Sequence, residues 1–255
     1  MKVALIPMSA KPYHAGHHKL IETAASQNDL VIVYVSFSGR GIRKIKDPTD
    51  KRTLQQGARR IEAPKKGEVP IFGSDMKYIW ENILIHELGL PEHVRIIFPD
   101  DAQPVSPISR VHDTCETLKK SFESGSRVFY APEVGLRSLS DTTLLRIYSD
   151  NKDISNNYDD YTMTEYYGDL FGKNIQLVGV SRTDTVDVSG SEMRGLILAD
   201  KNHRFKSLLP NLPENSKNII TDILFESARS GKPFVSRLRE RRAQSSLGSL
   251  PITSG

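Results

Sequence analysis

The feature that most constrains this fold is the alternation of short apolar runs with stretches of helical periodicity. The apolar runs are Val3–Ile6, Leu30–Phe37, Val94–Phe98, Arg127–Tyr130 and Ile175–Val180. Runs of this kind are typical of strands buried on both faces of a parallel sheet. Helical spacing of apolar residues occurs in His17–Ser26, Ser74–Leu88, Ile108–Phe122, the shorter Ser138–Ile147, and Glu192–Ala199. The alternation predicts an α/β fold: a doubly wound parallel sheet of five strands with right-handed crossovers.

Two stretches interrupt this alternation, and the composition changes after about Lys206. Gly39–Gly73 is polar, basic and broken by prolines, so it predicts a long lid or loop with one helical piece near Arg52–Ile61. Asn151–Leu170 is rich in Asn, Asp and Tyr and predicts a second irregular excursion. We therefore expect a domain over residues 1–205, with a basic insertion at about 39–73. A C-terminal helical appendage over 206–255 would contain the amphipathic helix Glu214–Arg229 and a flexible Ser- and Gly-rich end.

The positions of the basic residues are more informative about binding partners than the net charge, which is only +4. One group of cations is Arg40, Arg43, Lys44, Lys46, Lys51, Arg52, Arg59, Arg60, Lys65 and Lys66, and a second is Arg237, Arg239, Arg241 and Arg242. Clusters of this kind attract phosphate groups on nucleotides, nucleic acids or lipids. The basic tail is therefore expected to contact an acidic partner.

Composition also narrows the compartment and the partners. The single cysteine, Cys115, excludes an intrachain disulfide and a Cys-based zinc site, and it favours a reducing compartment. No apolar stretch approaches the ~20 residues that span a bilayer. The apolar run at Met1–Pro7 is too short for a signal peptide. We expect a cytoplasmic protein with no membrane partner.

A histidine motif follows the first predicted strand. The strand runs into Met8-Ser9-Ala10-Lys11 and then into His14-Ala15-Gly16-His17, where a helix is predicted to begin. In a Rossmann-like sheet, ligands bind beyond the carboxyl ends of the strands. A helix N-terminus and two imidazoles can hold phosphate, Lys11 adds a fixed positive charge, and Gly16 lets a base or ribose approach the backbone. Zinc is the weaker interpretation, because no third ligand follows at a convincing spacing.

A second motif follows the last predicted strand. Val188-Ser189-Gly190-Ser191-Glu192-Met193-Arg194 leads into a predicted helix that Ser189 could cap. Ser189, Ser191 and the backbone N–H groups of this turn can bind phosphates, and Arg194 can hold them with a bidentate fork. Arg182, just after the strand, could also reach phosphate, although a surface salt bridge would explain it equally well.

Together the two motifs resemble those of the HxGH nucleotidylyltransferase superfamily, which includes nicotinamide mononucleotide adenylyltransferases and polyol- and amino-alcohol-phosphate cytidylyltransferases. His14-Ala15-Gly16-His17 resembles the HxGH signature, and Ser189–Arg194 resembles the family's ISGTxxR element. The resemblance covers residues 1–205. Met8, Ser9 and Ala10 stand where the family has a glycine and a phenylalanine, so we expect unusual base recognition there.

The resemblance implies a reaction, its residues and its partners. An acceptor phosphate would attack the α-phosphorus of ATP or CTP, with magnesium on the triphosphate and release of pyrophosphate. His14, His17 and Lys11 would stabilise the α- and β-phosphates, while Ser189, Gly190, Ser191 and Arg194 would hold the leaving pyrophosphate. The serine motif favours ATP and nicotinamide mononucleotide, giving NAD. Homo-oligomers are common among relatives.

Other interpretations stay open at this point. The first is a cytidylyltransferase that uses CTP and a polyol or amino-alcohol phosphate. Pantoate activation fits the second motif less well. The last interpretation is a non-catalytic scaffold that retains the fold and docks through its basic tail, because a fold does not fix a function.

Overall fold

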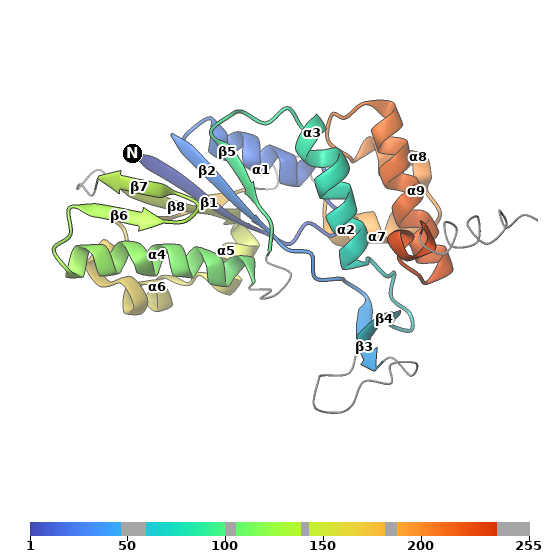
Figure 1. Ribbon diagram of the computed structural model, residues 1–255, viewed down its shortest axis with the longest axis horizontal. Coiled ribbons are helices and arrows are strands. Elements are labelled where there is room, and N and C mark those ends of the chain that lie inside the picture. The colour runs from blue at the N-terminus through green and yellow to red at the C-terminus, as the bar shows by residue number, and fades with distance from the viewer. Residues whose placement is uncertain (47–59, 100–105, 139–142, 182–187, 239–255) are drawn as a thin grey trace, which may run out of the picture. The chain divides into compact units, whose positions relative to one another are not determined.

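A five-stranded parallel sheet forms the centre of the first part of the chain. The computed structural model describes residues 1–46, 60–99, 106–138, 143–181 and 188–238. The strands are β1 (Lys2–Met8), β2 (Leu30–Val35), β5 (Val94–Ile97), β8 (Leu144–Asp150) and β9 (Ile175–Val180), in the spatial order β5-β2-β1-β8-β9 (Figure 1). All four pairings are parallel. The predicted α/β fold with a five-stranded parallel sheet is confirmed.

The contacts within the chain divide it into two compact units, each assembled from two segments. The first unit comprises Met1–Phe37 and Leu88–Gly190, and the second comprises Ser38–Glu87 and Ser191–Gly255. The parallel sheet belongs entirely to the first unit.

Helices cover both faces of the sheet in the first unit. Successive residues of a strand point to opposite faces. Val3 and Leu5 of β1 share a core cluster with Val111 and Cys115 of α4 (Pro107–Glu123). The helix α1 (Ala15–Ala25) packs on the other face, as Figure 1 shows. This double cover explains why the central strands read as continuous apolar runs.

The strand order reverses next to β1. The chain passes from β1 to β2 and β5 on one side, and β8 and β9 complete the sheet on the other side. In the register, Leu5 of β1 lies between Ile32 of β2 and Ile147 of β8. The carboxyl ends of β1 and β8 therefore mark the place where sheets of this type bind ligands.

The second unit combines a hairpin with a group of helices. The hairpin pairs β3 (Ile42–Lys46) with β4 (Arg60–Pro64). The helices are α2 (Gly73–Ile79), continued by a π-helical turn at Trp80–Leu84 and α3 (Ile85–Glu87), then α7 (Gly190–Leu198), α8 (Asn202–Ser207) and α9 (Glu214–Ser230). Trp80 is fully buried, and Phe205 of α8 meets Phe225 of α9 edge to face. The predicted amphipathic helix Glu214–Arg229 is confirmed as α9.

Three sequence predictions about the first unit are wrong. Arg127–Tyr130 corresponds to β6 (Val128–Ala131), which pairs antiparallel with β7 (Gly135–Ser138) and not with the parallel sheet. Ser138–Ile147 is not a helix, because the fourth strand of the sheet, β8, begins at Leu144. Asn151–Leu170 is not irregular: it forms α5 (Asn151–Asn157), α6 (Asp160–Tyr167) and a short 3₁₀ turn at Gly168–Leu170.

The basic insertion also differs from its prediction. Gly39–Gly73 is not an unstructured lid, because it contains the β3–β4 hairpin. Of the helical piece predicted near Arg52–Ile61, residues 52–59 lie outside the described residues, and Arg60 and Ile61 belong to β4. Among the helices that the structure describes, none has the length and apolarity needed to cross a membrane.

Candidate functional site

The histidine motif begins α1 directly beyond the carboxyl end of the central strand. His14 is the N-cap residue, with an extended backbone (φ −148°, ψ 171°), and its carbonyl accepts hydrogen bonds from the N–H groups of His17 and His18. The His14 side chain makes no capping hydrogen bond, and the first turn of α1 contains no acidic residue. The first N–H groups of a helix have no partner within the helix, and the helix dipole makes this end positive. The start of α1 is therefore suited to bind an anion.

The imidazoles of the motif lie against each other. The His14 and His17 rings are stacked, with centroids 3.8 Å apart, and Tyr13 stacks on His17 at 5.7 Å. His14 is only 5% exposed, whereas His17 is half-buried. Because the two rings are so close, one phosphate group could accept hydrogen bonds from both.

Tyr13 and His18, which were not among the predicted site residues, lie against this group. The Tyr13 hydroxyl is hydrogen-bonded to Nδ1 of His18 at 3.2 Å, and Nε2 of His18 lies 3.5 Å from Glu22. Burial raises the pKa of Tyr13 well above its ordinary value. Burial also lowers the pKa of His18, although the negative charge of Glu22 acts to raise it. The hydrogen bond to the half-buried His18, which in turn lies beside the exposed Glu22, thus helps to hold the Tyr13 ring against His17.

The segment between the strand and the motif follows the predicted path. Met8 is the last residue of β1, and its carbonyl accepts a hydrogen bond from Ser36 N at the end of β2. Ser9 is exposed, Ala10 is buried and Lys11 is half-buried. A cis peptide bond joins Lys11 to Pro12. Met8, Ser9 and Ala10 thus lie at the carboxyl edge of the sheet, as predicted.

The neighbouring strands place further polar groups at this edge. Asp150 ends β8 and caps α5, because its side chain accepts a hydrogen bond from Asp153 N. Asn151 lies beside Gly179 of β9, where an added Cβ would overlap the Asn151 amide oxygen. Neither residue was predicted as part of the site, because the strand β8 was not predicted from the sequence. A strand that ends in Asp-Asn is the signal that could have indicated them.

The second motif opens α7, and most of it belongs to the second unit. Ser189 and Gly190 are half-buried and end the first unit, whereas Ser191 is exposed and begins the second. The Arg194 guanidinium donates a hydrogen bond to Ser191 Oγ at 3.0 Å. The structure thus joins the serine and the arginine of this motif. Arg182 lies outside the described residues.

A second arginine influences the electrostatics of Arg194. The pKa of the Arg194 guanidinium is lowered, first by its partial burial and then by the positive charge of Arg40, while Glu68 has the opposite effect. All three residues belong to the second unit. Arg194 therefore feels one positive and one negative charge from the second unit, those of Arg40 and Glu68.

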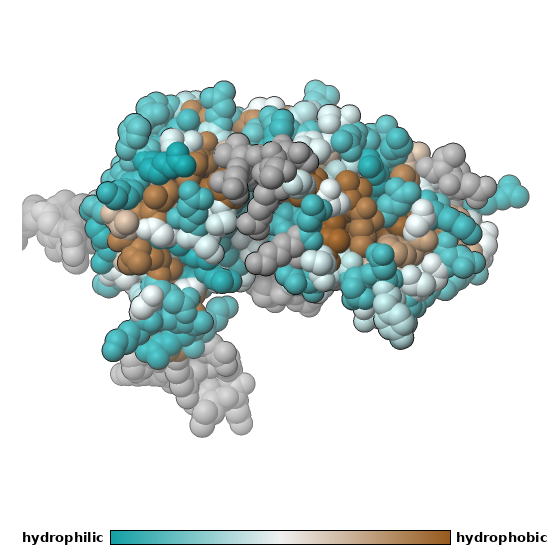
Figure 2. Space-filling model, turned by 180° about the vertical axis from the view of Figure 1, so that it is seen from behind, coloured by the Kyte–Doolittle hydropathy of each residue, from teal (hydrophilic) through white to brown (hydrophobic). Residues whose placement is uncertain are grey.

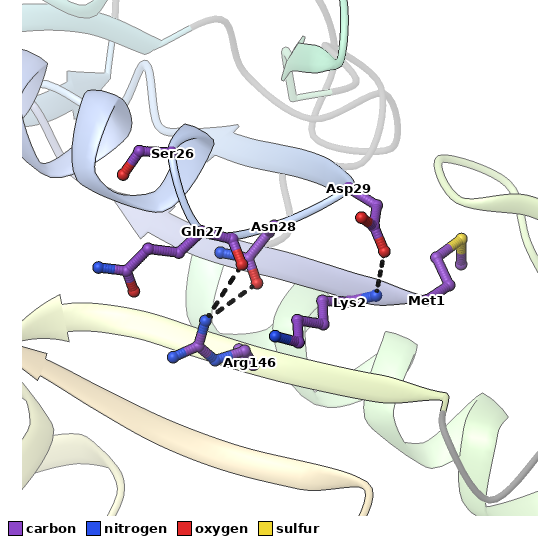
Figure 3. Close-up of a pocket in the computed structure, with 7 residues that line it drawn as sticks. All are labelled: Met1, Lys2, Ser26, Gln27, Asn28, Asp29 and Arg146. Carbon is purple, nitrogen blue, oxygen red and sulfur yellow. Dashed lines mark hydrogen bonds between the residues drawn. The ribbon is translucent and has the colours of Figure 1, made fainter.

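The first unit has a polar depression at the opposite edge of its sheet. It measures about 730 Å³ and is lined by the start of β1, the residues 26–29 that follow α1, and Arg146 of β8 (Figure 3). Arg146 reaches the Gln27 carbonyl at 3.5 Å and the Asn28 side chain at 3.4 Å, and its guanidinium lies over the Tyr148 ring. Since these contacts join the loop after α1 to β8, far from the strands' carboxyl ends, we assign this cluster a structural role.

Metal ligands do not converge anywhere in the described part of the chain. No group of three or more His, Cys, Asp or Glu side chains there has the arrangement of a metal site. Any magnesium would have to be held mainly by a ligand's phosphates and by water.

Comparisons with known proteins add no family. Neither a scan against models of protein families nor a search of curated proteins finds a match. One similar solved structure is that of TmcAL from Thermotoga maritima bound with α-thio ATP, with 16% identity and a TM-score of 0.32. The similarity covers 89% of this chain but only 57% of that protein. A likeness at this level does not establish a shared function.

Proposed function

We propose that this protein is a nucleotidylyltransferase that transfers AMP from ATP to a phosphorylated acceptor and releases pyrophosphate. The observation that carries the proposal is the position of the histidine motif. It caps the first helix directly beyond the central strand, next to the place where the strand order reverses. An anion-binding helix end with two stacked imidazoles at this position suits a nucleoside triphosphate.

The chemistry asks little of the protein beyond positioning and charge. An oxygen of the acceptor phosphate attacks the α-phosphorus of ATP, the bond from that phosphorus to the bridging oxygen breaks, and pyrophosphate leaves. The attacking phosphate is already anionic at neutral pH, so no strong general base is needed. His14, His17 and Lys11 would stabilise charge on the α- and β-phosphates. Ser189, Gly190, Ser191 and Arg194 would bind the leaving pyrophosphate.

Nicotinamide mononucleotide is the acceptor that the proposal favours, because Ser189–Arg194 resembles the adenylyltransferase form of the motif. Magnesium would be held mainly by the phosphates of the nucleotide and by water. It would neutralise the charge that builds up on the leaving pyrophosphate.

The direct experiment is a pyrophosphate-release assay. The wild-type chain is incubated with magnesium and either ATP or CTP, together with nicotinamide mononucleotide, glycerol phosphate or choline phosphate. We expect release with ATP and nicotinamide mononucleotide. Release of pyrophosphate with CTP but not with ATP would show that the protein is a cytidylyltransferase. No release with any pair of nucleotide and acceptor would overturn the proposal in favour of a non-catalytic scaffold.

Single substitutions then test the residues. His17→Ala removes a donor to the transition state, so we expect a rate loss of ~10²–10³-fold with the fold intact. Arg194→Gln should raise the KM for ATP and lower kcat, because it removes the bidentate hold on the phosphates. His86→Ala is the matched control, since His86 is an exposed histidine of α3. Near-full turnover of His17→Ala would remove this residue from the mechanism.

A further inference from the structure

The His17 imidazole lies in a stack of rings at the start of α1. Its ring centroid is 3.8 Å from that of His14 and 5.7 Å from that of Tyr13, with interplanar angles of 28° and 14°. His17 is half-buried, whereas Tyr13 is only 2% exposed. Two neighbouring rings therefore limit the directions in which the N–H groups of His17 can point, and one of these rings, Tyr13, belongs to the buried interior.

A hydrogen bond connects the Tyr13 ring to His18. The Tyr13 hydroxyl lies 3.2 Å from Nδ1 of His18. Since burial raises the pKa of Tyr13 well above its ordinary value, the phenol keeps its proton and donates it to this nitrogen. Burial lowers the pKa of His18, which favours the neutral imidazole with Nδ1 as the acceptor. The proton of the neutral ring is then on Nε2, which faces Glu22 at 3.5 Å.

Packing leaves room for the His18 ring to move. His18 borders a cavity of about 630 Å³, which is lined by further residues of α1 and, across from them, by Leu88–Pro91 and His93. The polar contacts of His18 with Tyr13 and Glu22 therefore matter for its position. Glu22 is exposed, in keeping with the hydrophilic side chains that cover much of the surface in Figure 2. His18 thus connects an exposed carboxylate to a buried phenol.

We propose that Tyr13 and His18 are positioning residues for His17, which set the direction of its N–H groups toward the phosphates of the nucleotide. The proposal rests on the proposed function and adds two residues that act through His17. A donor stabilises the charge that develops in a transition state best when it is held in place before the reaction. A misplacement of about 1 Å can cost on the order of 100-fold in rate. Loss of the hydrogen bond between Tyr13 and His18 should therefore slow the reaction and leave nucleotide binding almost unchanged.

Steady-state kinetics with ATP and nicotinamide mononucleotide test this role in the full chain. Tyr13→Phe keeps the ring and removes the hydroxyl, and His18→Ala removes the acceptor. Each should lower kcat about tenfold to a hundredfold. The KM for ATP should change by less than about twofold, because the lost effect acts on the transition state. His18→Asn places an amide oxygen near the position of Nδ1, so it should recover most of the wild-type kcat.

His93→Ala is the matched control. His93 is half-buried like His18, and its Nε2 lies 3.0 Å from the carbonyl oxygen of Ala25, at the other end of the same helix. Its removal should lower the urea midpoint by about as much as His18→Ala does, because each variant loses one hydrogen bond of α1. The kcat of His93→Ala should stay at the wild-type value. An equal loss of kcat in His93→Ala and His18→Ala would overturn the proposal, since both histidines would then only stabilise the helix.

The ring resonances of His17 provide a readout that does not depend on turnover. Because an aromatic ring shifts the resonances of a group stacked on it, Tyr13→Phe and His18→Ala should both shift the Hε1 signal of His17 in NMR spectra, and His93→Ala should not. An unchanged signal in both variants would overturn the proposal. If the signal shifts but no nucleotidylyl transfer is found, the reaction is wrong and the control of the His17 ring stands. If transfer occurs and both variants keep the wild-type kcat, the reaction stands and the positioning role is wrong.

Discussion

At the residue scale, Asp75 is a carboxyl group whose burial should be measurable in the stability of the protein. It is fully buried at the start of α2, and its Oδ1 accepts a hydrogen bond from Phe234 N at 2.8 Å. Burial raises the pKa of Asp75 to about 6, against hydrogen bonds and the Arg237 charge that lower it. The folded chain therefore holds this proton more tightly than the unfolded chain does.

The sign of the pH dependence follows from that difference. The stabilisation is fully present below the ordinary pKa of the carboxyl group and is lost as the pH rises through about 6. Between pH 5 and pH 8, the free energy of unfolding should fall by about 1 kcal/mol more in the wild-type chain than in Asp75→Asn. Urea unfolding at both pH values measures this. Equal slopes in the two chains would show that Asp75 does not titrate as described.

Much of the histidine half of the site was predictable from single residues, because the motif is local. His14, Gly16 and His17 follow the first strand within a few positions, and the structure places them at its carboxyl end. The support from Tyr13 and His18 was not predictable in the same way. An isolated tyrosine and a third histidine carry no pattern, and only the stacking and the 3.2 Å hydrogen bond reveal their part.

At the element scale, the base of the β3–β4 hairpin depends on Gly41. Gly41→Ala adds a Cβ at φ +64° against the Val69 carbonyl, so local opening of the hairpin should become easier by about 1–3 kcal/mol. Hydrogen exchange of the Arg40 and Ile71 amides, which bond each other's carbonyls, measures the change.

A second glycine substitution provides the comparison. Gly195 lies in α7 with no atom near its virtual Cβ, so Gly195→Ala should stabilise that helix by about 0.5–1 kcal/mol and leave the hairpin amides unchanged. If hydrogen-exchange protection of the Arg40 and Ile71 amides is unchanged in Gly41→Ala, Gly41 does not determine the stability of the hairpin base.

Elements were mispredicted where polar residues have structural roles. β8 contains Arg146, whose side chain donates hydrogen bonds to the loop after α1, so this central strand lacks a continuous apolar run. β6 was wrongly predicted as a buried strand of the parallel sheet because its residues are mostly apolar. Only alternate residues of β6 are buried, and Val128 and Tyr130 are 47% and 57% exposed. In α5 and α6, Asp150 and Asp159 are N-caps that accept hydrogen bonds from residues three positions later. An aspartate directly before a helix is a common N-cap, so these two residues could have indicated where α5 and α6 begin.

At the scale of the whole molecule, the grouping of the chain into units could not be read from periodicity. The sequence shows a basic insertion and a C-terminal helix as separate features, whereas the structure places both in the second unit. Contacts between α2 and α9 and the hydrogen bond from Phe234 N to Asp75 join segments about 150 positions apart. Such pairings depend on complementary buried surfaces, which no local pattern encodes.

The two units carry natural probes for a last prediction. The chain has one tryptophan and one cysteine. Trp80 is buried in the second unit and Cys115 in the first. Burial raises the pKa of the Cys115 thiol, so thiol reagents should label it only when the first unit opens. Trp80 fluorescence and Cys115 labelling thus report on different units.

The residues proposed to bind the triphosphate are divided between the two units, and the two probes test whether nucleotide stabilises each unit. Magnesium and ATP at about a hundred times the Kd should stabilise whichever unit they contact by about 2.7 kcal/mol. We expect urea midpoints to rise for both probes, and adenosine, which lacks phosphates, to have a much smaller effect. In Arg194→Gln the rise at Trp80 should be lost, because the second unit then lacks its main hold on the phosphates. A rise at Cys115 alone in the wild-type chain would mean that nucleotide binds only the histidine motif. If the urea midpoints of the two probes coincide without nucleotide, the chain unfolds as one cooperative unit. In that case, an ATP-induced rise of the midpoint that persists in Arg194→Gln would show that the second motif does not bind the nucleotide.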